Sequence, residues 1–112
     1  MKQVIAYIRP SSLELVTEGL KNVVGLAGMS AMGNSGFGRG KDSNCKRVDS
    51  QINRFSRNVR FEIMVTDDIV WDVVDTIRQQ ALTDQKGEGK IYVLDVVEAV
   101  QIRTKERGEA AV

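Results

Sequence analysis

The chain has 112 residues, enough for one domain, and 42% of them are hydrophobic, enough for a single modest core. Sixteen basic residues nearly balance fifteen acidic ones, which argues against a nucleic-acid coat or a membrane-surface protein. Histidine is absent, so the commonest general base and metal ligand is missing, and the single cysteine cannot form an internal disulfide. The composition favours a cytoplasmic protein with no secretory signal and no membrane-spanning segment.

The first half of the chain is predicted to form a strand, a helix and a strand. Segment 4–8 is short and rich in β-forming residues, which indicates a buried strand. Ser11 and Glu14 have the spacing of a helix capping box, and apolar residues then recur at helical intervals until Gly25, which should end the helix. The small residues of segment 26–33 predict a second strand in close contact with other backbone.

The second half begins with a strand and a helix. Segment 58–66 alternates, with one face made of Val59, Phe61, Ile63 and Val65 and the other of Arg60, Glu62 and Met64. Thr66, Asp67 or Asp68 should cap the next helix, because acidic residues suit a helix N-terminus. The apolar stripe of this helix comprises Ile69, Val70, Val73, Val74, Ile77 and Ala81, and Trp71 lies off it.

The last β-rich segment, 91–102, is one long strand or two strands broken near Glu98. The two halves then make an α+β protein with the ferredoxin-like βαββαβ fold, in which an antiparallel sheet carries both helices on one face. The opposite face would be bare and partly apolar, with Met64, Tyr92, Leu94 and Val96 on it. Because such a face is usually covered by another subunit, the pattern predicts an oligomer.

A polar and basic stretch separates the two halves. Between Arg39 and Arg60 the chain has seven basic residues against two acidic ones. This excess suits a polyanion or an acidic partner surface, and equally a solvated loop. Low aromatic content, 5%, argues against stacking on nucleic acid. Cys45 follows in the same stretch beside Lys46 and Arg47, and nearby cations lower the pKa of a thiol, so Cys45 is either reactive or an incidental loop cysteine.

Two glycine-rich segments, GFGRG at 36–40 and KGEGK at 86–90, could bind an anion through backbone amides. Lys90 and Arg103 can add positive charge, so a phosphate-bearing ligand suits these parts. Neither segment matches the P-loop or the dinucleotide fingerprint, and ordinary glycine turns between elements remain the alternative.

Taken together, these segments resemble the PII signal-transduction proteins, also called nitrogen regulatory protein P-II. The resemblance runs nearly end to end and covers MKQVIAYIRP, GFGRGK, VRFEIMVTDD, KGEGKIYV and QIRTKERGEAAV. It implies a single domain over 1–112 that assembles as a homotrimer with the sheets facing inward. It also implies adenine nucleotides in the clefts between subunits, and a flexible T-loop, residues about 37–57, that projects to partner proteins.

The resemblance also implies roles for individual residues. Nucleotide-binding residues would be Ser30, Gly36, Gly38, Arg39, Glu62, Met64, Gly87, Glu88, Gly89, Lys90 and Arg103, with Arg103 reaching a phosphate from the adjacent subunit. Residues of the T-loop that contact the partner would be Lys41, Lys46, Arg47 and Arg54. The phosphate-binding turn would be about 83–90 and the C-terminal segment about 103–112. ATP, ADP or AMP would be the ligand, with no prosthetic group, no metal site and no catalytic residue.

The chain departs from the family pattern at several positions. Gly40 replaces a glutamine that helps to hold Mg-ATP and 2-oxoglutarate, Asn58 replaces a lysine that contacts 2-oxoglutarate, and Gln101 replaces a phosphate-binding arginine. Gln51 lies near the position of a tyrosine that is uridylylated in many relatives. With less positive charge at the phosphates, ADP or AMP should compete unusually well with ATP.

The sequence therefore predicts a nucleotide-sensing regulator that controls an enzyme or a transporter through its T-loop, in nitrogen regulation or related metabolism. An alternative within the family is a divergent regulator of carbon, or bicarbonate, metabolism or transport. An enzyme has no base or nucleophile to support it, a nucleic-acid binder would use the basic stretch, and a metal-binding relative would have poor ligands.

Overall fold

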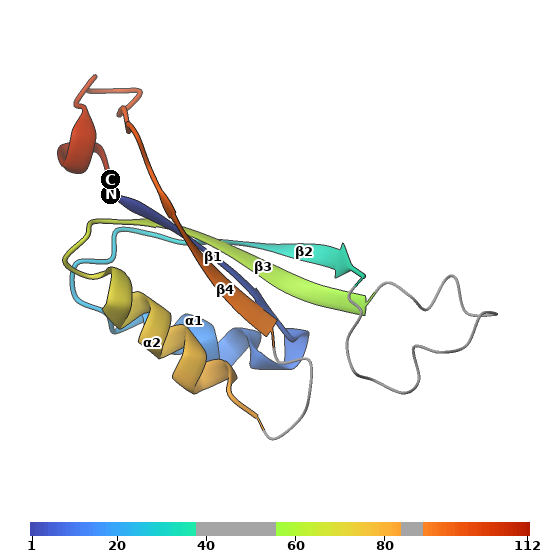
Figure 1. Ribbon diagram of the computed structural model, residues 1–112. Coiled ribbons are helices and arrows are strands. Elements are labelled where there is room, and N and C mark those ends of the chain that lie inside the picture. The colour runs from blue at the N-terminus through green and yellow to red at the C-terminus, as the bar shows by residue number, and fades with distance from the viewer. Residues whose placement is uncertain (38–55, 84–88) are drawn as a thin grey trace.

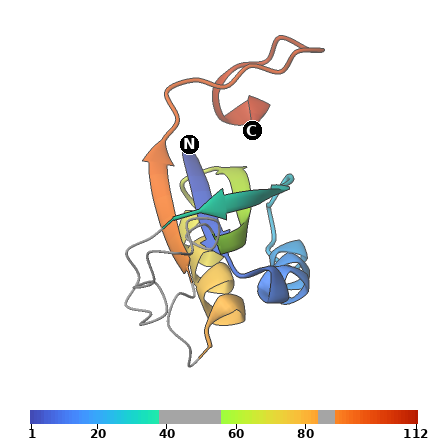
Figure 2. The same cartoon turned by 90° about the vertical axis from the view of Figure 1, so that its right-hand side faces the viewer.

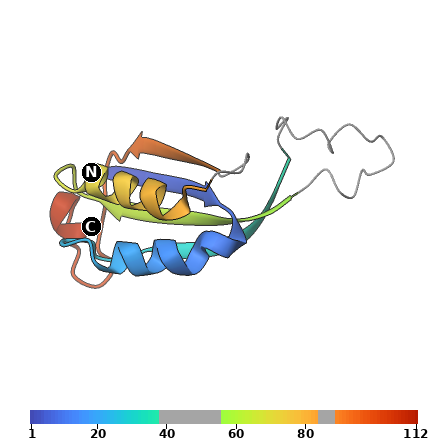
Figure 3. The same ribbon diagram turned by 90° about the horizontal axis from the view of Figure 1, so that it is seen from below.

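The computed structural model describes residues 1–37, 56–83 and 89–112 (Figure 1). Its elements are β1 Lys2–Ile8, a 3₁₀ turn Pro10–Ser12, α1 Leu13–Lys21, β2 Ser30–Gly36, β3 Ser56–Val65, α2 Val70–Ala81, β4 Gly89–Asp95 and a 3₁₀ turn Gly108–Ala111. The four strands form one sheet in the order β2-β3-β1-β4, with every neighbouring pair antiparallel. Both helices cover the same face of the sheet (Figure 3). The predicted ferredoxin-like α+β fold is confirmed.

The core lies between this face of the sheet and the two helices. Alternate strand residues point into it, and each helix contributes one apolar stripe, as the sequence pattern predicts. The buried apolar residues are Val4, Ala6, Ile8, Val16, Leu20, Val59, Phe61, Ile63, Val65, Ile69, Val70, Val73, Ile77 and Ala81. Trp71 is 65% exposed, which confirms that it lies off the stripe of α2. No helix of the described ranges is long and apolar enough to cross a membrane.

The connection from α1 to β2 differs from the prediction. Helix α1 ends at Lys21 rather than Gly25, because the N–H of Asn22 and of Val23 bond to carbonyls only three residues back, at 3.2 and 3.0 Å. Gly25 has φ +91° and turns the chain after the helix. β2 begins only at Ser30, where pairing with β3 starts, so the predicted strand at 26–33 is displaced toward Gly36.

Both predicted helix caps are wrong. Pro10 starts a 3₁₀ turn that contains Ser11, and the residue that precedes α1 makes no side-chain capping bond. Helix α2 also begins without a side-chain cap, after Ile69. The predicted capping residues are engaged elsewhere: the Thr66 hydroxyl donates to Asp68, and Asp67 accepts from the N-terminal amine at 2.8 Å.

Of the two alternatives for segment 91–102, one long strand is wrong, and the break comes earlier than Glu98. β4 ends at Asp95, which pairs with Lys2 at the first position of β1. Beyond that pair the Val96 N–H bonds to the carbonyl of Met1, and the ladder with β1 ends. The chain then continues into a separate hairpin, where Val100 forms an isolated bridge.

Candidate functional site

The face of the sheet opposite the helices is called the open face here. Strand alternation and register place on it the side chains of Gln3, Ile5, Tyr7, Ser30, Met32, Asn34, Asn58, Arg60, Glu62, Met64, Lys90, Tyr92 and Leu94. Its apolar members are 40–49% exposed at Met32, Met64, Tyr92 and Leu94, whereas the core residues are at most 8% exposed. The predicted bare face is thus confirmed for Met64, Tyr92 and Leu94, while Val96 lies beyond the end of β4.

Several predicted nucleotide-binding residues lie on the open face, but in two groups. Ser30 on β2 is the register partner of Glu62 on β3, so these two lie side by side. Lys90 is on β4 at the other side of β1, about 10 Å from β3 at the usual strand spacing. Gly38, Arg39, Gly87 and Glu88, and the predicted partner-binding residues Lys41, Lys46, Arg47 and Arg54, lie outside the described residues.

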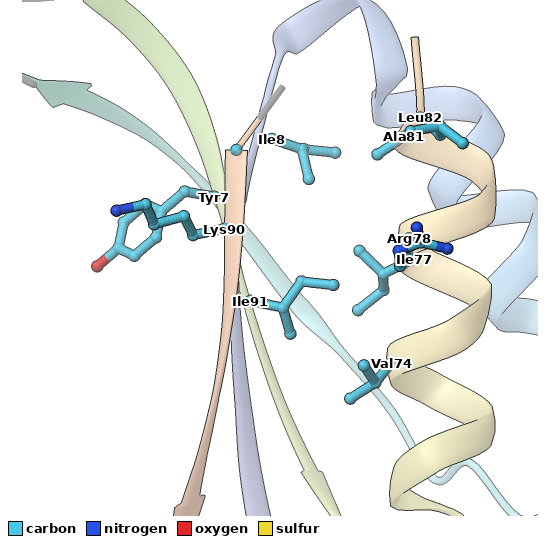
Figure 4. A pocket seen from close by; sticks show the side chains of 10 residues that line it. Tyr7, Ile8, Val74, Ile77, Arg78, Ala81, Leu82, Lys90 and Ile91 are labelled. Carbon is cyan, nitrogen blue, oxygen red and sulfur yellow. The ribbon is translucent and has the colours of Figure 1, made fainter. Parts of the chain in front are cut away.

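Tyr7 lies beside Lys90 and was not singled out by the sequence. It is the register partner of Lys90 on one side and of Arg60 on the other. The Arg60 guanidinium lies 5.8 Å from the centre of the Tyr7 ring, and the Tyr92 ring meets Tyr7 edge-on at 6.3 Å. In Figure 4 the side chains of Tyr7 and Lys90 extend to the same side of the sheet, away from α2. The pairing register of the strands brings these residues together, and the sequence does not reveal which residues of two distant strands are paired.

Gly89, the first residue of β4, lies very close to the backbone of β1. Its φ is +121°, and a Cβ at this position would lie 1.8 Å from the carbonyl oxygen of Tyr7. Any other residue would have to push the two strands apart. A glycine at 89 therefore sets the position of Lys90 directly after it.

Glu62 is held by two donors. Its Oε1 accepts from Gln3 Nε2 and from an Arg60 guanidinium nitrogen, each at 3.1 Å. The prediction counted Arg57 and Arg60 with the basic stretch, but both belong to β3, and Arg60 is paired with a carboxylate. The pairing of Arg60 with Glu62 therefore removes one of the seven basic charges that were counted with this stretch.

An amide pair joins β2 and β3 near their ends. Asn34 Nδ2 donates to Asn58 Oδ1 at 2.9 Å, and strand pairing continues to Gly36 and Ser56. A Cβ on Gly36 would lie 3.0 Å from Asn58 Nδ2, so glycine leaves room for this amide. The predicted T-loop therefore loses its last two residues to β3, and residues 38–55 of it lie outside the described part of the chain.

Arg103 lies far from Lys90 within one chain. Lys90 is near the start of β4, and Asp95 at its end is roughly 17 Å away at about 3.3 Å per residue. Arg103 lies further along the chain, between Gln101 and Lys105, which are joined by a backbone bond. Figure 1 shows the segment that follows β4 extending beyond the sheet. Neither the Lys90 nor the Arg103 side chain makes a hydrogen bond or ion pair with another described residue. The chain thus presents one free cation near the start of β4 and another in the hairpin that follows the strand.

A cleft of about 460 Å³ lies between α2 and the strands β1 and β4 (Figure 4). Its walls are mainly apolar and include Ile8, Val74, Ile77, Ala81, Leu82 and Ile91. Tyr7, Arg78 and Lys90 also line it, but the Lys90 side chain extends away from α2, toward the open face. Among the described residues, no three Asp, Glu, Cys or His side chains gather as metal ligands would.

Comparison with known proteins decides the family. The family model described as "Nitrogen regulatory protein P-II" matches residues 1–106. The chain belongs to the P-II family. Similar P-II proteins include those of Klebsiella oxytoca and Escherichia coli K12, each 42% identical over 113 aligned residues that cover both chains completely, and that of Bradyrhizobium diazoefficiens, 40% identical with the same coverage.

A solved P-II structure gives the same answer for the fold. The Arabidopsis thaliana PII protein bound to citrate superimposes with a TM-score of 0.80 at 33% identity, over 99% of this chain and 91% of that one. As a P-II protein, the chain is a signal-transduction regulator. The resemblance seen in its short motifs is confirmed along the full length.

Proposed function

We propose that this P-II protein is an adenine-nucleotide sensor. ATP, ADP or AMP binds between the chains of a homotrimer, and its occupancy controls a partner enzyme or transporter through the segment that joins Gly36 to Ser56. The observation that carries this proposal is the separation of two cations with unpaired side chains, Lys90 near the start of β4 and Arg103 in the hairpin beyond its end.

A phosphate group held by Lys90 is out of reach of Arg103 in the same chain. In a cyclic assembly each chain repeats the same contact with the next, so the hairpin of one chain can lie against the β4 entrance of its neighbour. Lysine and arginine are the usual partners of phosphate oxygens. The half-exposed apolar residues of the open face would be covered in the same assembly.

An anionic ligand agrees with the chemistry of the fold. The Arabidopsis relative was solved with citrate, a compact polyanion. We infer that this chain also binds a polyanion, and the inference does not extend to citrate itself. Gly89 brings backbone close to Tyr7 and leaves Lys90 free to meet the ligand.

ADP and AMP should compete well with ATP in this chain. Gln101 supplies no charge where relatives have arginine, and the Asn58 amide is already bonded to Asn34. A lost charge-assisted contact costs roughly 1.5–3 kcal/mol. Calorimetry should give ATP and ADP affinities within tenfold of each other and little effect of 2-oxoglutarate. Thermal shifts with 2-oxoglutarate and bicarbonate would distinguish nitrogen from carbon metabolism.

Subunit mixing tests whether one site is shared between chains. Lys90→Ala and Arg103→Ala should each weaken ADP binding by about 1.5–3 kcal/mol, as expected for a charged contact. When the two variants are co-expressed, about one interface in four combines the intact Lys90 of one chain with the intact Arg103 of the next. Calorimetry on the mixture should then show that fraction of sites at parental affinity.

Arg78→Ala is the matched control, because it removes a cation from α2 near the cleft and should leave ADP binding unchanged. A protein that is monomeric by light scattering and ignores all adenylates would refute the proposal. If the co-expressed mixture contains no sites with the parental affinity for ADP, the proposal that two chains share one site is refuted.

A further inference from the structure

Beyond β4 the chain folds into a compact hairpin over residues 98–108, called the C-terminal hairpin here. Its two arms are joined by backbone bonds, from Gly108 to the Ala99 carbonyl at 3.0 Å and from Gln101 to the Glu106 carbonyl at 2.8 Å. Figures 1 and 2 show this hairpin extending past the end of the sheet. Two-stranded hairpins are marginally stable by themselves, so further contacts decide whether it stays closed.

Glu98 supplies such contacts at the open end of the hairpin. Its Oε2 accepts from the Arg107 guanidinium at 2.9 Å, and its Oε1 accepts from the Gly108 N–H at 3.0 Å and the Ala99 N–H at 3.2 Å. One carboxylate thus ties both arms together. The Ala99 N–H, together with the charge of Arg107, holds the pKa of the Glu98 carboxyl below its usual range.

The tip of the hairpin shows that its shape is maintained against strain. Lys105 has φ +65°, a conformation that residues other than glycine rarely adopt. Its N–H bonds to the Gln101 carbonyl at 2.9 Å. Between these two residues lie Ile102, which is 98% exposed, and the unpaired Arg103. The hairpin therefore holds a free cation in a defined place outside the body of the chain.

We propose that Glu98 is a positioning residue of the nucleotide site, closing the C-terminal hairpin so that Arg103 is already in place for a phosphate held by the neighbouring chain. The inference rests on the proposed function. An open hairpin would have to be ordered when the nucleotide binds, and that entropy cost would lower affinity. Glu98 acts through Arg103 and does not touch the ligand.

Double-mutant calorimetry with ADP on the full-length assembly tests this role. Glu98→Ala should weaken ADP binding about tenfold, the effect of one charge-assisted hydrogen bond. In an Arg103→Ala background the same substitution should have no further effect, because the residue that it positions is gone. Glu106→Ala is the matched control, since it removes the same charge from the same hairpin, where its carboxylate has no partner among the described residues.

Amide hydrogen exchange without nucleotide gives a second measurement. Glu98→Ala should accelerate exchange at Gly108 and Gln101 and leave the core strands unchanged, which also shows that the variant folds. Faster exchange with unchanged ADP affinity would overturn the inference, as would an equal loss of affinity in both backgrounds. If Arg103→Ala weakens binding and Glu98→Ala does not, only this inference fails. If neither Lys90→Ala nor Arg103→Ala changes affinity, the proposed function fails as well.

Discussion

Gly89→Ala should be among the most damaging single changes outside the buried core. The residue has φ +121°, and an added Cβ would lie 1.8 Å from the Tyr7 carbonyl oxygen. That oxygen belongs to a central strand and cannot rotate away as a side chain could. The substitution must therefore shift the β1–β4 pairing and displace Lys90.

The expected loss has two parts. A residue with a Cβ in such a conformation costs about 1–3 kcal/mol, and forcing the backbone to make room costs another 1–3 kcal/mol or so. Together they amount to about 2–6 kcal/mol, a large share of the roughly 5–15 kcal/mol that stabilises a typical domain.

Urea unfolding followed by circular dichroism measures this loss, at one protein concentration for all variants because subunit association adds to stability. Gly25→Ala is the matched control: φ is also positive at +91°, but the added Cβ would make only an ordinary 3.5 Å contact with Ile69. It should lose about 1–2 kcal/mol, the conformational part alone. Equal losses for Gly89→Ala and Gly25→Ala would refute the steric argument.

Other contacts predict changes in stability and in acid titration. Gly19→Leu should lose about 1–3 kcal/mol in the same assay, because its Cβ would lie 2.9 Å from a Thr76 carbon. Phe61→Ala should lose about 3–5 kcal/mol, because the side chain is 1% exposed. The pKa of Glu98 is lowered from 4.5, so its stabilising contribution is complete above that pH and disappears as pH falls through the lower folded value. The NMR signal of the Ala99 amide should move only in that acid range. Unchanged stability of Gly19→Leu or Phe61→Ala would contradict the corresponding packing contact. A midpoint at pH 4.5 or above for the Ala99 amide signal would contradict the contacts of Glu98.

The parts of the fold that depend on local periodicity were predictable from the sequence. Segment 58–66 alternates strictly, and α2 repeats valine and isoleucine at helical spacing, so both elements and their buried faces were found. The sequence also carried enough short motifs, from the first strand to the turn before Lys90, to indicate the family.

The parts that depend on distant partners were not predictable. The end of β4 is set by the first residues of β1, and the start of β2 is set by β3. Asp67 looked like a helix cap, but the N-terminal amine, 66 residues away in sequence, binds it instead. Each of these outcomes depends on a partner that is distant in the sequence, and a local sequence pattern carries no information about that partner.

The same limit applies to the candidate site. Sequence reasoning placed Lys90, Glu62 and Ser30 in it, and the structure puts all three on the open face. It missed Tyr7, because a tyrosine in a β-rich segment looks like any other strand residue. The closeness of Tyr7 to Lys90 and Arg60 comes from the register of three strands.

The side-chain bond between Asn34 and Asn58 is uncharged, so this contact near the end of the β2–β3 pairing should not change with pH or ionic strength. Gly36 and Ser56 stay opposite each other, so the chain leaves the sheet and re-enters it at neighbouring points. Doubling the length of a flexible segment between two such fixed ends costs only about 0.6 kcal/mol in loop-closure free energy. The segment between Gly36 and Ser56 can thus change in sequence or length during evolution, and so acquire a new partner protein, while the sheet and the helices stay the same.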